Sequence, residues 1–152
     1  MAENHEKFMK ECIDLAKQAV ARGDPPFGSV LVREGTVIAG GRNRSASENN
    51  FMLHAELNIL ADALKNFGPE VFSQCTLYSS NEPCPMCAGA IYWSGVRRVI
   101  YGMSGNTLME IRGWGLHASG HEVLLRGTDV VTVVEGVLEK EIREMHETFW
   151  KT

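Results

Sequence analysis

The sequence predicts an α/β fold of three layers, α/β/α, in which helices cover both faces of a central five-stranded mixed sheet. Three observations support this prediction. A helical pattern opens the chain, a strand–turn–strand pattern follows it, and helical and extended patterns then alternate to the end. The 152 residues suit a single domain, 1–152, which is long enough to form a core without disulfide bonds.

The first half of the chain predicts a helix, a hairpin and a second helix. Apolar side chains recur at helical spacing over residues 5–21, and the sequence Gly-Asp-Pro-Pro at 23–26 ends that helix. Residues 27–43, FGSVLVREGTVIAGGRN, predict two short strands around a Glu-Gly turn. A second amphipathic helix begins at His54 and ends at a Gly-Pro pair. We expect the buried side of this helix to carry Leu57, Leu60, Ala61 and Leu64.

The second half of the chain predicts three more strands. The segments CTLYSS at 75–80 and RRVIYG at 97–102 predict parallel strands joined by a crossover helix. DVVTVVEG at 129–136 predicts the fifth strand. Residues 102–126 are rich in Gly, Trp and His, and we assign no element or role to them. Residues 137–150 predict a closing helix, and its buried side is expected to carry Val137, Leu138, Ile142 and Met145.

The composition predicts a cytoplasmic protein. A hydrophobic content of 44% is ordinary for a globular chain, and no apolar run approaches the roughly 18 residues of a membrane span. The charged N-terminus lacks the apolar stretch of a signal peptide. A net charge of −4 argues against a broad nucleic-acid surface. Four cysteines are too few for a disulfide scaffold, so we expect Cys12 and Cys75 to be buried apolar residues.

The segment SSNEPCPMCAGAIYW, residues 79–93, places two cysteines three residues apart. Cys84 falls at the expected N-cap of the crossover helix, Pro85 at its first position, and Cys87 one turn further on. Both thiols therefore face the positive end of a helix dipole, which favours the thiolate form. Thiolates suit a redox pair, a structural zinc clip or a catalytic metal site, and local geometry alone leaves the three open.

A histidine and a glutamate at the start of the second helix favour the catalytic metal site. His54 adds one imidazole to the thiolates of Cys84 and Cys87, which gives three zinc ligands and leaves a fourth position open to water. Zinc lowers the pKa of such a water towards roughly 7. Glu56 lies two residues after the histidine, where its carboxylate can reach the water and move protons.

The sequence His-Ala-Glu at 54–56, followed by Pro-Cys-x-x-Cys at 83–87, matches the signature of zinc-dependent nucleobase deaminases. The segments PPFGSVLV, GGRNR, LHAEL, EPCPMCAGAI and RRVIYG come in the order that this family shows. The chain therefore resembles the zinc-dependent cytidine deaminase-like superfamily, in the branch of the cytosine, guanine and tRNA adenosine deaminases. This resemblance spans most of the chain.

The resemblance implies a hydrolytic reaction with one Zn²⁺ per chain. His54, Cys84 and Cys87 would hold the zinc, and Glu56 would carry protons while water replaces an exocyclic amine and ammonia leaves. The other histidines have no ligand spacing, and we expect them at the surface or in loops; they are His5, His117, His121 and His146.

The resemblance also implies substrate contacts. Asn43 matches an asparagine that hydrogen-bonds the substrate, Phe27 a residue near the bound ring, and the backbone N–H of Ala55 would bond the ring edge. Trp114 either lines the rim of the pocket or packs beneath its own loop. Phe149 and Trp150 either close over a small base as a lid or anchor the last helix to the core.

Three substrates and one non-enzymatic role compete. Leu53 and the aromatic C-terminus resemble fungal-type cytosine deaminases, so we favour a free, cytosine-like base. Guanine is the less favoured base, because MEIRGWG stands where guanine deaminases have a GFDD-like stretch. The segment TLMEI instead resembles tRNA adenosine deaminases. A catalytically silent zinc-binding assembly subunit is the remaining hypothesis, and Glu56 argues against it because a structural zinc needs no adjacent carboxylate.

The resemblance further implies a homodimer. Relatives bury the helix that follows the cysteine motif against a partner subunit. Here that helix carries Met86, Ile91, Tyr92 and Trp93, which one sheet face cannot all cover.

Overall fold

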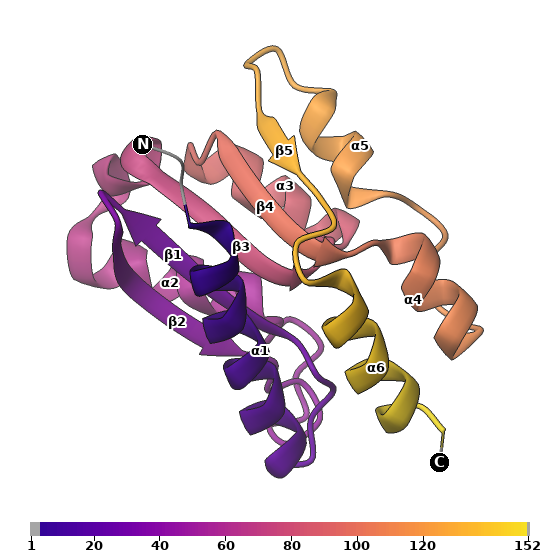
Figure 1. Cartoon of the computed structure of the whole chain (residues 1–152). Helices are drawn as coiled ribbons and strands as arrows, with labels where there is room; N and C mark the ends of the chain where they lie inside the picture. The colour runs from indigo at the N-terminus through magenta and orange to yellow at the C-terminus, as the bar shows by residue number, and fades with distance from the viewer. Residues whose placement is uncertain (1–3, 152) are drawn as a thin grey trace.

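The computed structural model describes residues 4–151, so residues 1–3 and 152 of the predicted domain lie outside the described residues. One five-stranded sheet with the order β2-β1-β3-β4-β5 forms its centre (Figure 1). Its strands are β1 (Gly28–Arg33), β2 (Thr36–Arg42), β3 (Cys75–Asn81), β4 (Arg98–Met103) and β5 (Thr132–Val134). Its helices are α1 (His5–Ala21), α2 (Ala55–Phe67), α3 (Pro85–Ser94), α4 (Gly105–Arg112), α5 (Gly120–Leu125) and α6 (Glu139–Phe149), with a 3₁₀ turn, η1 (Pro69–Gln74).

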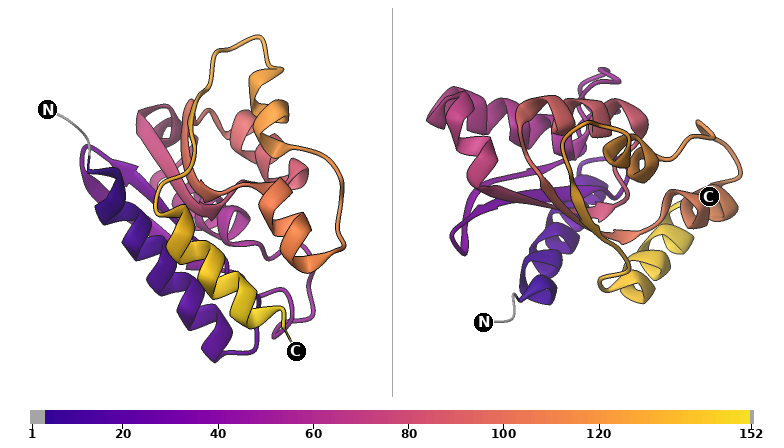
Figure 2. Two further views of the ribbon diagram at one scale, coloured as in Figure 1. Left: turned by 45° about the vertical axis from the view of Figure 1, so that its right-hand side comes forward. Right: turned by 90° about the horizontal axis from the view of Figure 1, so that it is seen from above.

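The predicted mixed sheet is confirmed. β1 pairs antiparallel with β2 and with β3, whereas β3–β4 and β4–β5 are parallel pairs. The view from above in Figure 2 shows α1 and α6 on one face of the sheet and α2, α3 and α5 on the other. The chain therefore has the expected three layers.

Side chains of the central strands alternate between the two faces of the sheet and contribute to the hydrophobic core on each face. In β1, Leu31 packs under α2 and α3, while Val30 and Val32 face α1 and α6. In β3, Leu77 and Tyr78 divide between the two faces in the same way. Because helices cover both faces, these strands are buried along nearly their whole length.

The buried side of α2 differs from the prediction. Leu64 is 50% exposed and Ala61 is also exposed, whereas the buried residues are Ala55, Glu56, Asn58, Ile59, Leu60 and Ala63. The reason lies in β2, because a Cβ at Gly41 would stand 2.9 Å from the Ile59 side chain. The missing side chain lets α2 approach the sheet through Ile59 and Asn58, which turns Ala61 and Leu64 outward while Leu60 stays buried as predicted.

Two other predictions need correction. Residues 102–126, for which no element was predicted, form the end of β4, α4 and α5. On α3, Ile91 is fully buried rather than available to a partner, while Trp93 is 84% exposed. The closing helix packs as expected, with Ile142 buried and Val137, Leu138 and Met145 partly buried. Within residues 4–151, no helix is long and apolar enough to cross a membrane.

Candidate active site

The starts of α2 and α3 bring together the three residues predicted as metal ligands. His54 is the N-cap of α2, Cys84 is the N-cap of α3, and Cys87 lies in the first turn of α3. The His54 Nδ1 atom is 3.6 Å from the Cys84 Sγ atom and 3.4 Å from the Cys87 Sγ atom. Among the described residues, this is the one group of three or more potential ligands that lie within 4.8 Å of one another.

The donor set fits zinc. A tetrahedral ion with ordinary Zn–N and Zn–S bonds places a nitrogen and a sulfur ligand about 3.6 Å apart. Two sulfurs and one imidazole nitrogen match the preference of zinc for N and S ligands, and they leave one position for water. The Nδ1 atom of His54 is the ring nitrogen that faces both sulfurs.

The charges of the site also favour a cation. The pKa of Cys84 is lowered to about 4, because Cys87 hydrogen-bonds its sulfur and His54 adds a second hydrogen bond, against the opposing effect of burial. The pKa of Cys87 is raised, because its thiol is hydrogen-bonded to Cys84 and is buried. Cys84 is therefore the thiolate that Cys87 and His54 stabilise when no metal is bound.

Glu56 lies in the first turn of α2, beside this thiolate. Its side chain is buried, and burial raises its pKa to about 7, with a further contribution from the charge of Cys84. A carboxyl group whose pKa lies near neutrality can both accept and donate a proton there, as general acid–base catalysis requires.

Asn43 lies in the loop that leads to α2 and is nearly fully buried. Its Oδ1 atom accepts hydrogen bonds from the Ser45 backbone N–H at 2.9 Å and from the Ser45 hydroxyl at 2.8 Å. This fixes the amide and leaves its Nδ2 group as the donor that can meet a ligand. The backbone N–H of Asn43 donates to the Phe27 carbonyl, which joins two of the predicted substrate residues.

Comparison with known proteins agrees with this site. Residues 2–103 match the family described as the cytidine and deoxycytidylate deaminase zinc-binding region. The chain is 43% identical over 99 residues to a guanine deaminase of Bacillus subtilis, covering 64% of each protein. It is 30% identical to a probable cytosine deaminase of Schizosaccharomyces pombe, covering 99% of this chain and 94% of that protein.

Two further relatives extend the comparison. A tRNA-specific adenosine deaminase of Bacillus subtilis is 36% identical, covering 96% of this chain and 88% of that protein. The solved structure of a guanine deaminase from Nitrosomonas europaea superposes with a TM-score of 0.85 at 26% identity, covering 100% of this chain and 87% of that one.

The chain belongs to this zinc-dependent deaminase family. It is a hydrolytic nucleobase or nucleoside deaminase, and zinc is its cofactor. The family membership favours an enzyme over the silent zinc-binding subunit.

Aromatic residues from distant parts of the deaminase meet near the end of α6. The Phe27 ring lies 5.2 Å from the His146 ring, and the Trp150 indole N–H donates to the His146 Nδ1 atom at 3.0 Å. Trp150 also makes edge-to-face contacts with Trp114 and Phe149, at 5.7 Å and 4.7 Å between ring centroids. The four aromatic residues predicted as substrate contacts therefore form one continuous cluster through His146.

The expectation that His146 lies at the surface was wrong. This histidine is fully buried, and its Nε2 atom lies 3.2 Å from the Oδ1 atom of Asn81, at the end of β3. Because Nδ1 accepts from Trp150, the proton resides on Nε2 and is donated to Asn81. Burial lowers the pKa of His146 to about 4, so the ring is neutral. The sequence signal for its burial was its position four residues after Ile142, which places both side chains on the same face of the helix.

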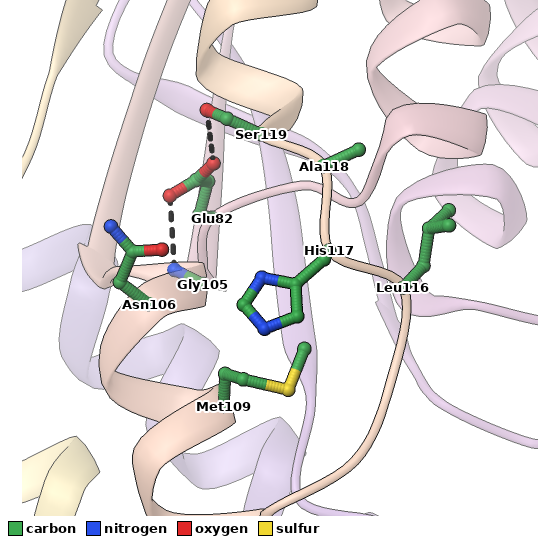
Figure 3. A pocket seen from close by; sticks show the side chains of 8 residues that line it. All are labelled: Glu82, Gly105, Asn106, Met109, Leu116, His117, Ala118 and Ser119. Carbon is green, nitrogen blue, oxygen red and sulfur yellow. Dashed lines mark hydrogen bonds between the residues drawn. The ribbon is translucent and has the colours of Figure 1, made fainter.

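Glu82 is a second residue whose role the sequence did not reveal. Its carboxylate accepts hydrogen bonds from the Gly105 N–H and the Ser119 hydroxyl, both at 2.9 Å (Figure 3). It also accepts one from the His121 N–H at 3.2 Å. A Cβ at Gly120 would stand 1.7 Å from the Pro83 carbonyl oxygen, so this loop packs directly on the residue before Cys84.

Glu82 thus fastens the beginnings of α4 and α5 to the segment that carries the metal-binding cysteines. A cavity of about 160 Å³ lies at this junction, and none of the predicted zinc ligands lines it. Its walls are Glu82, Gly105, Asn106, Met109, Leu116, His117, Ala118 and Ser119.

Proposed function

We propose that this deaminase acts on a free nucleobase or a related aminated heterocycle, with a cytosine-like base favoured and guanine as the second candidate. The aromatic cluster around Trp150 carries the proposal. Its indole is tied to His146, which contacts Phe27, and Trp114 packs on its edge. A small planar base has few polar groups for hydrogen bonding, so enclosure by aromatic surface would supply much of its binding free energy.

In this proposal His54, Cys84 and Cys87 hold the zinc. The bound zinc supplies a water whose pKa is lowered, so that hydroxide is available near neutral pH. Glu56 would carry both protons of that water in turn, the first to the ring nitrogen and the second to the exocyclic amine, which leaves as ammonia. The oxygen remains on the ring carbon as the new carbonyl. Asn43, through Nδ2, and the Ala55 backbone N–H donate to the acceptors of the base.

Deamination of adenosine in tRNA is the alternative function, and two observations favour it. The relative from Bacillus subtilis that bears that name aligns with nearly the whole chain. Trp114 is also 59% exposed beside Arg112, and an exposed aromatic ring with a cation can stack on an unpaired base of RNA.

A coupled ammonia assay on the zinc-loaded protein separates the candidates. The panel contains cytosine, guanine, adenosine and a tRNA anticodon stem-loop, each at low and high salt. We expect turnover of a free base or related heterocycle to depend weakly on ionic strength, because such a small substrate needs no series of phosphate contacts. An RNA substrate would instead lose affinity steeply as salt rises. Deamination of the stem-loop alone, with none of the free bases, would overturn the proposal.

A further inference from the structure

Arg112, the last residue of α4, is a half-buried cation that no acidic residue of the described chain neutralises. Other arginines of residues 4–151 form ion pairs, as Arg97 does with Asp129 and Arg143 with Glu147. Within the same part of the chain, the one hydrogen bond of the Arg112 side chain runs from Nε to the Trp114 carbonyl oxygen, at 3.0 Å. Burial lowers the pKa of this guanidinium, as expected where a charge has lost part of its hydration.

Two tryptophans hold the guanidinium in place. Its central carbon lies 4.1 Å from the Trp114 ring centroid and 5.2 Å from that of Trp150. The loop after α4 closes around it, because a Cβ at Gly115 would stand 2.7 Å from an Arg112 Nη atom. With Nε engaged by a backbone carbonyl, the Nη1 and Nη2 groups remain as a fixed pair of donors.

This cation adjoins the aromatic cluster around Trp150, which holds the proposed substrate contacts. Figure 1 shows α4 and the end of α6 side by side, and Trp150 joins Arg112 to His146 and Phe27. Burial is the main cause of the low pKa of His146, and the charge of Arg112 lowers it further. The guanidinium is therefore linked to the His146 imidazole through Trp150 and is within electrostatic reach of it.

We infer that Arg112 is a specificity-determining residue that binds an anionic substituent, a carboxylate or a phosphate, on the heterocycle that the deaminase converts. The inference rests on the proposed function, since it names a substrate class for the same site. Two parallel Nη donors match the two oxygens of such a group, and a partly dehydrated cation attracts an anion more strongly than one in water. The stacking on Trp114 and Trp150 orients the guanidinium before the substrate arrives.

A structural role makes a different prediction. The cation also lies at the C-terminal end of α4, where a positive charge stabilises a helix, and it packs between two rings. If that were its whole function, replacing it would lower stability without changing the preference between neutral and anionic ligands.

The test measures binding of reaction products, which need no turnover. Calorimetry on the zinc-loaded protein compares uracil with uracil-5-carboxylate, for the carboxylate, and with uridine 5′-monophosphate, for the phosphate. We expect one of the two anions to bind at least about tenfold more tightly than uracil. Arg112→Gln is expected to reduce that preference about 10- to 100-fold, the range for hydrogen bonds to a charged group. Arg143→Gln, which removes the same charge from the exposed face of α6, should leave the preference unchanged.

Equal binding of uracil and both anions by the wild-type protein would overturn the inference, as would a preference that survives Arg112→Gln. The ammonia assay on cytosine, cytosine-5-carboxylate and cytidine 5′-monophosphate reports separately on the proposed function. If the protein prefers an anion but releases no ammonia, the proposed function is wrong and the binding role of Arg112 is retained. Ammonia release from cytosine without any preference for the anions would support the proposed function and contradict the role of Arg112.

Discussion

At the scale of single residues, ligation and proton transfer fall on neighbouring side chains that mutation can separate. Cys87 lies in the first turn of α3 with its sulfur 3.4 Å from the His54 Nδ1 atom. Glu56 is buried beside them and is not among the three potential ligands. A loss of zinc and a loss of proton transfer should therefore have different signatures.

We expect Glu56→Gln to keep zinc at about one ion per chain and to lose turnover by roughly 10²- to 10⁴-fold, the usual contribution of general acid–base catalysis. The amide preserves the shape of the side chain but cannot carry the proton. Cys87→Ala should instead lose both zinc and activity, because it removes a ligand. Elemental analysis and the ammonia assay measure the two effects. Near-normal turnover of Glu56→Gln, or full zinc content in Cys87→Ala, would contradict the assignment.

His146 shows what single-residue reasoning misses. This histidine lies in a polar stretch and at no spacing typical of a set of metal ligands. The sequence pattern therefore does not indicate that it connects other aromatic residues. Its role follows from two partners that are distant in sequence, Asn81 on β3 and Phe27 before β1. The sequence proposes Asn43, Phe27 and Trp150 as substrate contacts only through resemblance, and the residue that connects Phe27 to Trp150 emerges from the tertiary structure.

At the scale of elements, the end of α6 carries two of the proposed substrate contacts, Phe149 and Trp150. Phe149 and Trp150 are each half-buried, which fits an aromatic surface better than a fully packed core. Trp150 is held by two hydrogen bonds to His146, one from its indole N–H to Nδ1 and one from its backbone N–H to the carbonyl, both at 3.0 Å, and by ring contacts. A neutral hydrogen bond contributes about 1 kcal/mol and an aromatic pair about as much, so losing this segment costs a few kcal/mol at most.

Truncation after Glu147 should therefore give a folded, zinc-loaded protein with sharply weakened turnover of its base. Thermal unfolding, zinc analysis and kcat/KM measure the three properties. A protein that ends at Trp150 is the matched control and should behave like the full chain. Unchanged activity after truncation would show that no lid exists.

If the truncated protein fails to fold, a second variant is needed to separate a lid from a core role. Trp150→Phe keeps a ring and removes only the donor to His146, so it should fold and still raise KM. If it unfolds the protein instead, the aromatic pair belongs to the core.

The elements themselves follow the local patterns closely. Proline and glycine mark the ends of α1 and α2, and alternation marks β1 and β3, so these elements were predictable from residues close in sequence. The segment 102–126 was not, because its two short helices depend on Glu82, which accepts from the starts of both. The outward turn of Leu64 likewise depends on Gly41 in another element.

At the scale of the whole molecule, the unburied apolar surface of α3 bears on assembly. Trp93 is 84% exposed and Met86 is 38% exposed, although α3 is the helix that carries the metal-binding cysteines. Tyr92 next to Trp93 is engaged within the chain, since Arg97 lies 4.3 Å from its ring centroid. Within residues 4–151 the exposed tryptophan has no such cover, as its one ring contact there is with Tyr92. Large exposed aromatic residues are typical of the centres of protein interfaces.

We therefore expect a homodimer that buries the outer side of α3, in which each Trp93 meets the partner across a two-fold axis. Light scattering at micromolar concentration should give twice the mass of the 152-residue chain. Trp93→Glu should shift the protein to the monomer, because two carboxylates would face each other in a desolvated contact. Val20→Glu is the matched control, since Val20 is 39% exposed on α1, which covers the opposite face of the sheet, and its change should leave the mass unchanged. A wild-type monomer under these conditions, or a dimer that tolerates Trp93→Glu, would show that this face of α3 does not carry the assembly.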